Sequence, residues 1–102
     1  MMAVFRKLAR KSDVPPGSGR TVDIEGRAVA LLNDGGRFHV VDNTCLHMGG
    51  PLGEGAVEEG CVVCPWHQWR YDLKTGAHVN DPGSKVKVYE VRVEGEEILV
   101  GI

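Results

Sequence analysis

The sequence predicts an all-β fold built from antiparallel hairpins, and three observations lead to this prediction. Polar and apolar residues alternate in short runs, as they do in strands that bury one face. Fourteen glycines and five prolines make 19 of the 102 residues, an excess that suits many turns. No segment carries the sustained 3.6-residue apolar periodicity of an amphipathic helix.

The first part of the chain predicts one strand, a loop and a hairpin. Val4–Ala9 alternates as a strand, and the prolines and glycines of Pro15–Gly19 then require a loop. Arg20–Ile24 and Arg27–Leu32 flank the pair Glu25-Gly26, which is typical of a tight hairpin turn.

Two further turns organise the rest of the strand pattern. The run Asp34–Gly36 turns the chain into a strand at Arg37–Val41. Near the end of the chain, Lys85–Val93 alternates as one long strand, and Glu94-Gly95 reverses it into Glu97–Val100.

The middle of the chain, from Asp42 to Pro82, differs from both ends. Its strand signals are short, and it holds all three cysteines and three of the four histidines. We therefore expect a single domain in which a β framework carries a loop-rich segment, where functional residues usually lie.

Charge and hydropathy exclude several classes of protein. A net charge of -2 argues against a nucleic-acid binder or a polybasic membrane-binding arm. The longest aliphatic run, Ala28–Leu32, is far shorter than the ~20 residues of a membrane span or the ~7–15 of a signal peptide. We expect a cytoplasmic protein whose thiols stay reduced, so its odd number of cysteines indicates ligands or buried thiols rather than disulfides.

Two short motifs predict a metal centre. Cys45 and His47 form a Cys-x-His pair, and sixteen residues later Cys64 and His67 form a Cys-x-x-His pair. A Cys2His2 zinc finger places both cysteines in one pair and both histidines in the other. The mixed pairs instead suggest two unlike metal positions, one bound by thiolates and one by imidazoles.

This pattern closely resembles the Rieske iron–sulfur family. The resemblance covers most of the chain, and it is carried by four segments in particular: Cys45–Leu52, Cys64–His67, Tyr71–Gly76 and Asp81–Gly83. It implies a Rieske-like fold, in which a basal β-sandwich (residues 3–42 and 84–102) carries a small cluster-binding subdomain (residues 43–83).

By this resemblance, one [2Fe-2S] cluster is held by Cys45 and Cys64 on one iron and by His47 and His67 on the other. Histidine ligands leave the oxidised centre formally neutral, which makes reduction easier than in a four-cysteine cluster. The positions expected around the cluster are Gly49, Gly50, Trp66, Trp69, Tyr71 and Pro82.

The same positions predict the reduction potential. Gly50 and Trp66 stand where high-potential relatives carry a disulfide, and Trp69 stands where they carry a serine hydroxyl. Fewer hydrogen bonds to the sulfurs stabilise the reduced cluster less, although the phenol of Tyr71 acts in the opposite direction. We expect a potential in the lower half of the roughly -150 to +300 mV range of Rieske centres.

The expected function is that of a ferredoxin rather than an enzyme, because the sequence has no 2-His-1-carboxylate iron site and no G-x-G-x-x-G motif. The resemblance implies a monomeric one-electron carrier between a flavin-dependent reductase and the terminal oxygenase of a ring-hydroxylating dioxygenase system. The alternative within the family is the small subunit of an NAD(P)H-dependent nitrite reductase, with the large subunit as its partner.

Cys61 supports two alternatives outside the family. It could complete a Cys3His zinc site with Cys45, His47 and Cys64, which would make the chain a zinc-stabilised interaction module. It also forms a Cys-x-x-Cys pair with Cys64, but a thioredoxin-like motif opens a helix in a βαβ unit. The favoured interpretation is that Cys61 is a small apolar residue on a strand.

The remaining candidates have ordinary interpretations. His39 is expected to be a strand residue and His78 a surface or turn residue near the third loop, with a neighbour of the cluster as the alternative for His78. Trp66 is expected to shield the cluster from water. The carboxylates of Glu54, Glu58 and Glu59 form a solvated face, with acidic contacts to a partner as the alternative.

Overall fold

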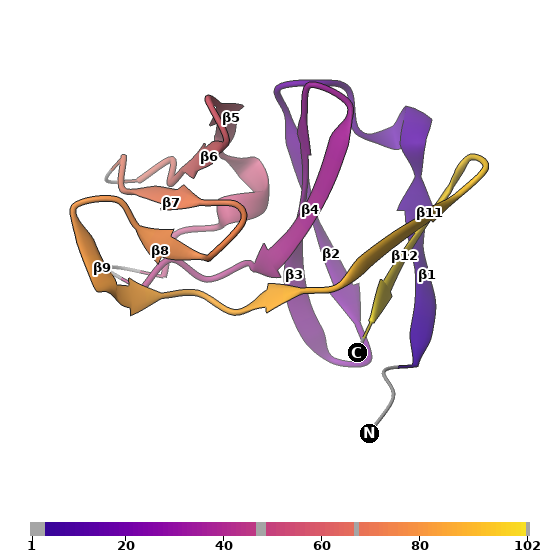
Figure 1. The fold of residues 1–102 in the computed structure, drawn as a ribbon. Coiled ribbons are helices and arrows are strands. Elements are labelled where there is room, and N and C mark those ends of the chain that lie inside the picture. The colour runs from indigo at the N-terminus through magenta and orange to yellow at the C-terminus, as the bar shows by residue number, and fades with distance from the viewer. Residues whose placement is uncertain (1–3, 47–48, 67, 102) are drawn as a thin grey trace.

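A computed structural model describes residues 4–46, 49–66 and 68–101, which form three antiparallel sheets (Figure 1). The all-β prediction is confirmed, because the helical residues in these ranges lie in two short 3-10 turns, η1 (Lys11–Asp13) and η2 (Leu52–Glu54). No helix within the described residues is long and apolar enough to cross a membrane. The strands are β1 (Phe5–Arg10), β2 (Gly19–Ile24), β3 (Arg27–Asp34), β4 (Arg37–Asp42), β5 (Ala56–Glu58), β6 (Cys61–Val63), β7 (Arg70–Asp72), β8 (Ala77–His78), β9 (Asp81–Lys85), β10 (Val88–Tyr89), β11 (Val91–Glu94) and β12 (Glu97–Gly101).

The sheets separate the molecule into two parts. The sheets β1-β12-β11 and β10-β4-β3-β2 face each other, and the sheet β5-β6-β7-β8-β9 lies on the other side of β3 and β4 (Figure 1). The middle sheet of the molecule is therefore covered on both faces.

The two predicted hairpin turns in this middle sheet are confirmed. Ile24 pairs with Arg27 across one turn, and Asp34 pairs with Arg37 across the next. Both central residues of each turn have positive φ, at 52° and 82° for residues 25–26 and at 61° and 100° for residues 35–36. Such two-residue turns match the right-handed twist of paired strands, so they set the register of β2, β3 and β4.

The single strand predicted over Lys85–Val93 is wrong. The chain there divides between β9, β10 and β11, and each of these strands belongs to a different sheet. Val88 pairs with Val41 in the middle sheet, while Val91 pairs with Val100 of β12. The alternating pattern identifies which residues face an interior, but it carries no information about which strand supplies the partner.

Strand β3 explains the aliphatic run Ala28–Leu32, because successive side chains of a strand point to opposite faces. Val29 and Leu31 enter a core between the two facing sheets, and Ala30 and Leu32 enter a second core on the other face. The first, which we call the sandwich core, contains Val14, Ile24, Val29, Leu31, Val40, Tyr89, Ile98 and Val100. The second, which we call the cysteine core, contains Ala30, Leu32, Val41, Cys45, Leu52, Val57, Val62, Cys64, Tyr71, Leu73 and Val86.

Buried Asn43 fixes the first cysteine-bearing loop to the middle sheet. Its side-chain oxygen accepts hydrogen bonds from the Gly53 amide (2.8 Å) and from the Thr21 hydroxyl (3.0 Å). Its carbonyl accepts a third bond from the Leu52 amide (2.7 Å). The loop that follows β4 is therefore held at its base on a rigid strand, rather than by its own contacts alone.

Truncating two neighbouring leucines of β3 one at a time tests the two cores separately. Leu31→Ala and Leu32→Ala should each lower the free energy of unfolding by about 2–5 kcal/mol, since each removes a fully buried side chain. Of the two variants, we expect only Leu32→Ala to speed the reaction of the buried cysteines with a maleimide. The cavity that it leaves lies in the same core as Cys45 and Cys64, whereas the cavity left by Leu31→Ala lies in the sandwich core. Equal labelling rates in both variants would contradict the separation.

Candidate metal centre

The two buried cysteines begin loops with the same hydrogen-bond pattern. The Cys45 amide donates to the Gly50 carbonyl, and the Gly49 amide donates to the Cys45 carbonyl, both at 2.9 Å. In the second loop the Cys64 amide donates to the Trp69 carbonyl (2.8 Å), and the Gln68 amide donates to the Cys64 carbonyl (2.9 Å). Each cysteine is thus the first residue of a closed turn, bonded to the residues four and five positions later.

The backbone of the two loops repeats as well. Gly49 and Gln68, each four residues after its cysteine, have positive φ values of 75° and 58°. A glycine adopts this conformation freely, whereas the glutamine is held there by the surrounding turn. The sequence did not reveal the repeat, because a glycine and a glutamine occupy equivalent positions.

The two loops lie against each other at Gly50. A Cβ atom built on Gly50 would come within 2.6 Å of the Cys64 sulfur and 3.2 Å of the Trp66 ring. The backbone of the first loop therefore passes directly beside the sulfur of the second. Cys45 and Cys64 are both buried and belong to the same core, so the fold brings together residues that are 19 positions apart.

Tyr71, on β7, connects this core to the first loop. Its hydroxyl oxygen lies 3.3 Å from the Cys45 sulfur and accepts a hydrogen bond from the Leu46 amide at 3.1 Å. Burial raises the pKa of Tyr71 well above its usual range, and the hydrogen bond with Cys45 raises it further. The phenol therefore keeps its proton near neutral pH and can donate it to a sulfur acceptor. This contact places a phenol beside one of the two buried sulfurs.

His78 is buried, and its expected place as a surface or turn residue is wrong. It pairs with Tyr71 across β7 and β8, and its ring stacks on Trp69 with a centroid separation of 4.1 Å. The Nδ1 atom is buried without a hydrogen-bond partner among the described residues. The sequence alone did not indicate this burial, because it does not show that His78 pairs with the core residue Tyr71 across the sheet.

Cys61 lies apart from the other two cysteines. It occupies β6 next to buried Val62, so its side chain points to the opposite face of that strand. Burial raises the pKa of the Cys61 thiol, and the negative charge of Asp72 raises it further. This placement favours neither the Cys3His zinc site nor a redox pair with Cys64.

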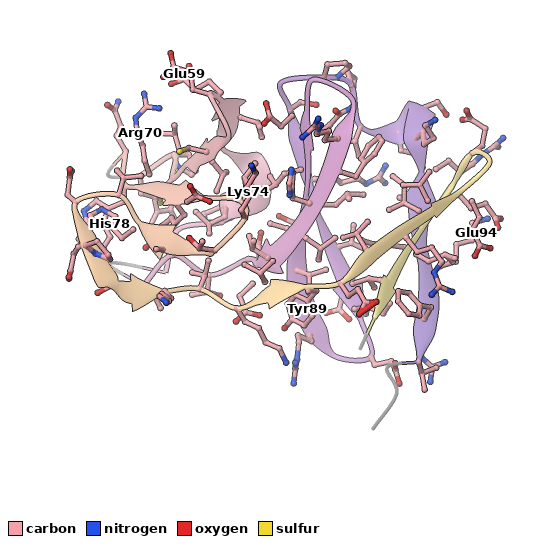
Figure 2. All side chains as sticks on the ribbon, viewed as in Figure 1. Glu59, Arg70, Lys74, His78, Tyr89 and Glu94 are labelled. Carbon is pink, nitrogen blue, oxygen red and sulfur yellow. The ribbon has the colours of Figure 1, made fainter. Side chains whose placement is uncertain are left out.

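The remaining predicted neighbours lie at the edge of this site. Trp66 is 58% exposed, whereas Trp69 is half-buried and packs on the cysteine core. Pro82 is exposed near the start of β9, and its role remains a prediction. Of the three glutamates, Glu58 forms an exposed ion pair with Arg70 at 2.6 Å. Figure 2 labels Arg70 and Glu59.

The donor chemistry fits a thiolate-bound metal centre. Two buried sulfurs on facing loops, with a phenol donor beside one of them, suit a centre that places negative charge on sulfur. In residues 4–46, 49–66 and 68–101, no three metal-binding side chains converge. His47 and His67 lie outside the described residues, so their expected part in the site remains a prediction.

Comparisons with known proteins find matches along most of the chain. A family model described as Rieske [2Fe-2S] domain matches residues 5–97. The chain is 34% identical over 98 residues to the biphenyl dioxygenase ferredoxin subunit of Pseudomonas sp. (strain KKS102), covering 94% of this chain and 90% of that protein. The ferredoxin of carbazole 1,9a-dioxygenase from Nocardioides aromaticivorans IC177 superposes with a TM-score of 0.85 and 29% identity, covering 97% and 98% of the two chains. A Mycobacterium tuberculosis structure named as an NADH-dependent nitrite reductase small subunit has a TM-score of 0.91 and 27% identity, covering 100% and 97%.

Serine substitution at Cys61 and Cys64 tests which thiols bind metal. Cys64→Ser should lose the bound metal, because the substitution removes a buried sulfur from the paired loops. Cys61→Ser should retain it, which makes this the matched control. Metal and acid-labile sulfide content of the purified variants provides the measurement, and loss of metal in Cys61→Ser alone would refute the assignment.

Proposed function

The chain belongs to the Rieske [2Fe-2S] domain family, and from this membership we propose that it carries single electrons to the terminal oxygenase of a ring-hydroxylating dioxygenase system. The observation that carries the proposal is the pair of matching loops that place Cys45 and Cys64 in one buried core. Relatives that match along nearly their whole length are ferredoxin components of dioxygenase systems, which are electron carriers rather than catalytic enzymes. A flavin-dependent reductase would supply the electrons.

We propose that Cys45 and Cys64 hold one iron of the [2Fe-2S] cluster and that His47 and His67 hold the other. The cluster accepts and releases one electron when bound. Burial of both sulfurs excludes water from the thiolate side of the site, and the close approach of Gly50 leaves no room there for a larger side chain.

Tyr71 would adjust the reduction potential. A phenol that donates a hydrogen bond to the Cys45 sulfur stabilises the reduced and more negative form of the centre more than the oxidised form. The Leu46 amide occupies a lone pair of the same oxygen and so directs the phenolic proton toward sulfur. Because this single donor raises the potential, it supports a value that lies in the lower half of the Rieske range but above the negative end of that range.

The proposal extends to the domain organisation and the compartment. Residues 43–83 would form the cluster-binding part, and residues 3–42 and 84–102 would form the basal part of a single domain. The sheet β5–β9, which covers the cysteine core, supports this division. A cytoplasmic location is proposed because thiols stay available as ligands in that reducing compartment.

A nitrite reductase small subunit is the second candidate. It is favoured by the structure from Mycobacterium tuberculosis, which matches this chain over its full length. The two candidates share the fold and differ in the protein that receives the electron.

Spectroscopy tests whether the chain binds the cluster, and electron-transfer kinetics test which protein receives the electron. The reduced protein should give the electron paramagnetic resonance signal of a mixed-valence Rieske centre, and a missing signal at full iron loading would exclude the cluster. Stopped-flow mixing should then show rapid oxidation of the reduced protein by a purified biphenyl dioxygenase oxygenase component. Faster oxidation by a nitrite reductase large subunit would instead support the second candidate.

Tyr71→Phe should lower the reduction potential by on the order of 40 mV, which corresponds to about 1 kcal/mol of preferential stabilisation of the reduced state. Tyr89→Phe is the matched control, because Tyr89 is also a buried and hydrogen-bonded phenol but belongs to the sandwich core. Protein-film voltammetry measures both potentials. Equal potentials for Tyr71→Phe and the parent protein would show that the phenol does not act on the cluster.

A further inference from the structure

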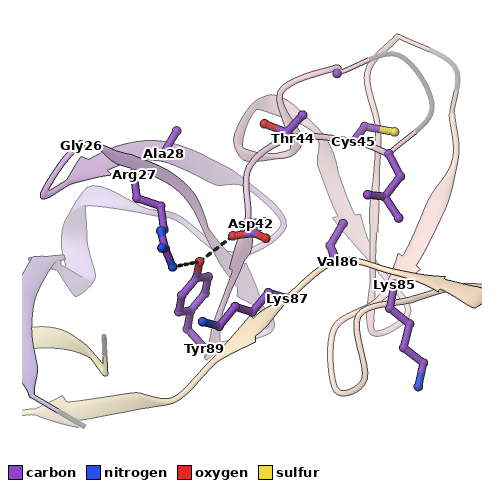
Figure 3. A pocket seen from close by; sticks show the side chains of 12 residues that line it. Gly26, Arg27, Ala28, Asp42, Thr44, Cys45, Lys85, Val86, Lys87 and Tyr89 are labelled. Atoms are coloured by element: carbon purple, nitrogen blue, oxygen red, sulfur yellow. Dashed lines mark hydrogen bonds between the residues drawn. The ribbon is translucent and has the colours of Figure 1, made fainter.

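A wide groove lies beside the first cysteine loop. It has a volume of about 880 Å³ and is bounded by β3, the end of β4, residues Thr44, Cys45, Leu46 and Gly49 of the first cysteine loop, and the segment that joins β9 to β10 (Figure 3). Cys45 and Leu46 belong to its lining, so the groove reaches the loop that carries one of the proposed ligands. The function proposed above does not use it.

The charges of this groove are opposite in sign to the net charge of the chain. Arg27, Lys85 and Lys87 are all exposed in its lining, against one carboxylate, Asp42. Three cations and one anion give a local charge of +2, whereas the whole chain has a net charge of -2. No ion pair among the described residues includes any of the three cations.

Tyr89 orders two of the cations. Its hydroxyl donates to Asp42 at 2.6 Å and accepts from Arg27 at 3.1 Å, and Lys87 lies over its ring at 4.9 Å from the centroid. The hydrogen bond to Tyr89 raises the pKa of Arg27 above its usual value. The half-buried carboxylate of Asp42 is therefore engaged by Tyr89, while Arg27 and Lys87 are held on the groove surface.

The cations are spread along the groove rather than gathered around one point. Arg27 and Lys87 lie near Tyr89 at one end, and the Lys85 side chain extends from the other end (Figure 3). Leu46, which is 52% exposed, adds an apolar residue at the rim next to the cysteine loop. A spread of positive charge beside an exposed apolar residue suits an extended acidic protein surface better than a single small anion.

We propose that this groove docks a carboxylate-rich surface of the redox partner and so aligns that partner beside the Cys45 loop. This inference rests on the proposed function as an electron carrier. Complementary charge would speed the encounter and fix its orientation, which suits a complex that must form and separate at each turnover. A nucleic acid is disfavoured because the net negative charge of the chain opposes a long polyanion.

Two double variants with the same net charge test the groove. Lys85→Glu/Lys87→Glu and Arg10→Glu/Lys11→Glu each replace two positive charges with two negative ones, which takes the net charge of the chain from -2 to -6. Arg10 and Lys11 are exposed at β1 and η1 and do not line the groove, so this second variant controls for overall charge. The probe is a fluorescent ten-residue polyglutamate, and its anisotropy is measured with the iron-loaded protein at low ionic strength.

We expect the groove variant to bind polyglutamate about fivefold more weakly than the control variant, with the difference disappearing at high salt. Equal binding by the two variants, or no binding by the parent protein, would overturn the proposal. Tighter binding of a ten-residue single-stranded oligonucleotide, lost in the same groove variant, would instead identify a general polyanion site and would also overturn it.

The electron paramagnetic resonance signal of the reduced variants distinguishes a failure of this inference from a failure of the proposed function. A normal signal with no effect of the groove charges would refute only the docking groove. An absent signal in the parent protein would refute the electron carrier itself. If the glutamate variant does not fold, Lys85→Gln/Lys87→Gln against Arg10→Gln/Lys11→Gln provides the same comparison with two charges removed from each.

Discussion

Two cysteine sulfurs from loops that begin 19 residues apart must meet in one buried place, and the architecture around them serves this requirement. Each loop closes on its own cysteine through two backbone hydrogen bonds, which fix the backbone of that cysteine. The middle sheet then provides the base, because Asn43 holds the first loop to it and Leu32 belongs to the same buried core as both cysteines. Without that base, contacts within the loops alone would have to offset the conformational entropy that the loops lose when they become ordered.

Burial of the middle sheet on both faces has a consequence for function. One face stabilises the framework through the sandwich core, and the other contributes to the cysteine core, where the metal centre is proposed to lie. Side chains that point in opposite directions from a single strand thus serve stability and redox chemistry separately. The centre sits on a rigid sheet, which favours electron transfer because little rearrangement accompanies the change of charge.

The hydroxyl groups of Tyr71 and Tyr89 likewise form hydrogen bonds in two separate parts of the molecule. Tyr71 shares a hydrogen bond with the Cys45 sulfur inside the cysteine core, whereas Tyr89 orders Arg27, Asp42 and Lys87 at the surface of the groove. In the proposed carrier, the first adjusts the reduction potential of the cluster, and the second presents the cations of the proposed docking groove. Both act close to the same loop, so the potential and the docking of the carrier are adjusted within one region.

The sequence by itself determined the all-β class, the tight hairpins and the two Cys-His pairs, because alternation, turn residues and ligand spacing are local properties of the chain. It also predicted Tyr71 as a neighbour of the site. Only the tertiary structure decided that Lys85–Val93 crosses three sheets, that His78 is buried against Trp69, and that Arg27 joins Lys85 and Lys87 around one groove. These features depend on which strands become neighbours, and an alternating pattern specifies the buried face of a strand without specifying its partner.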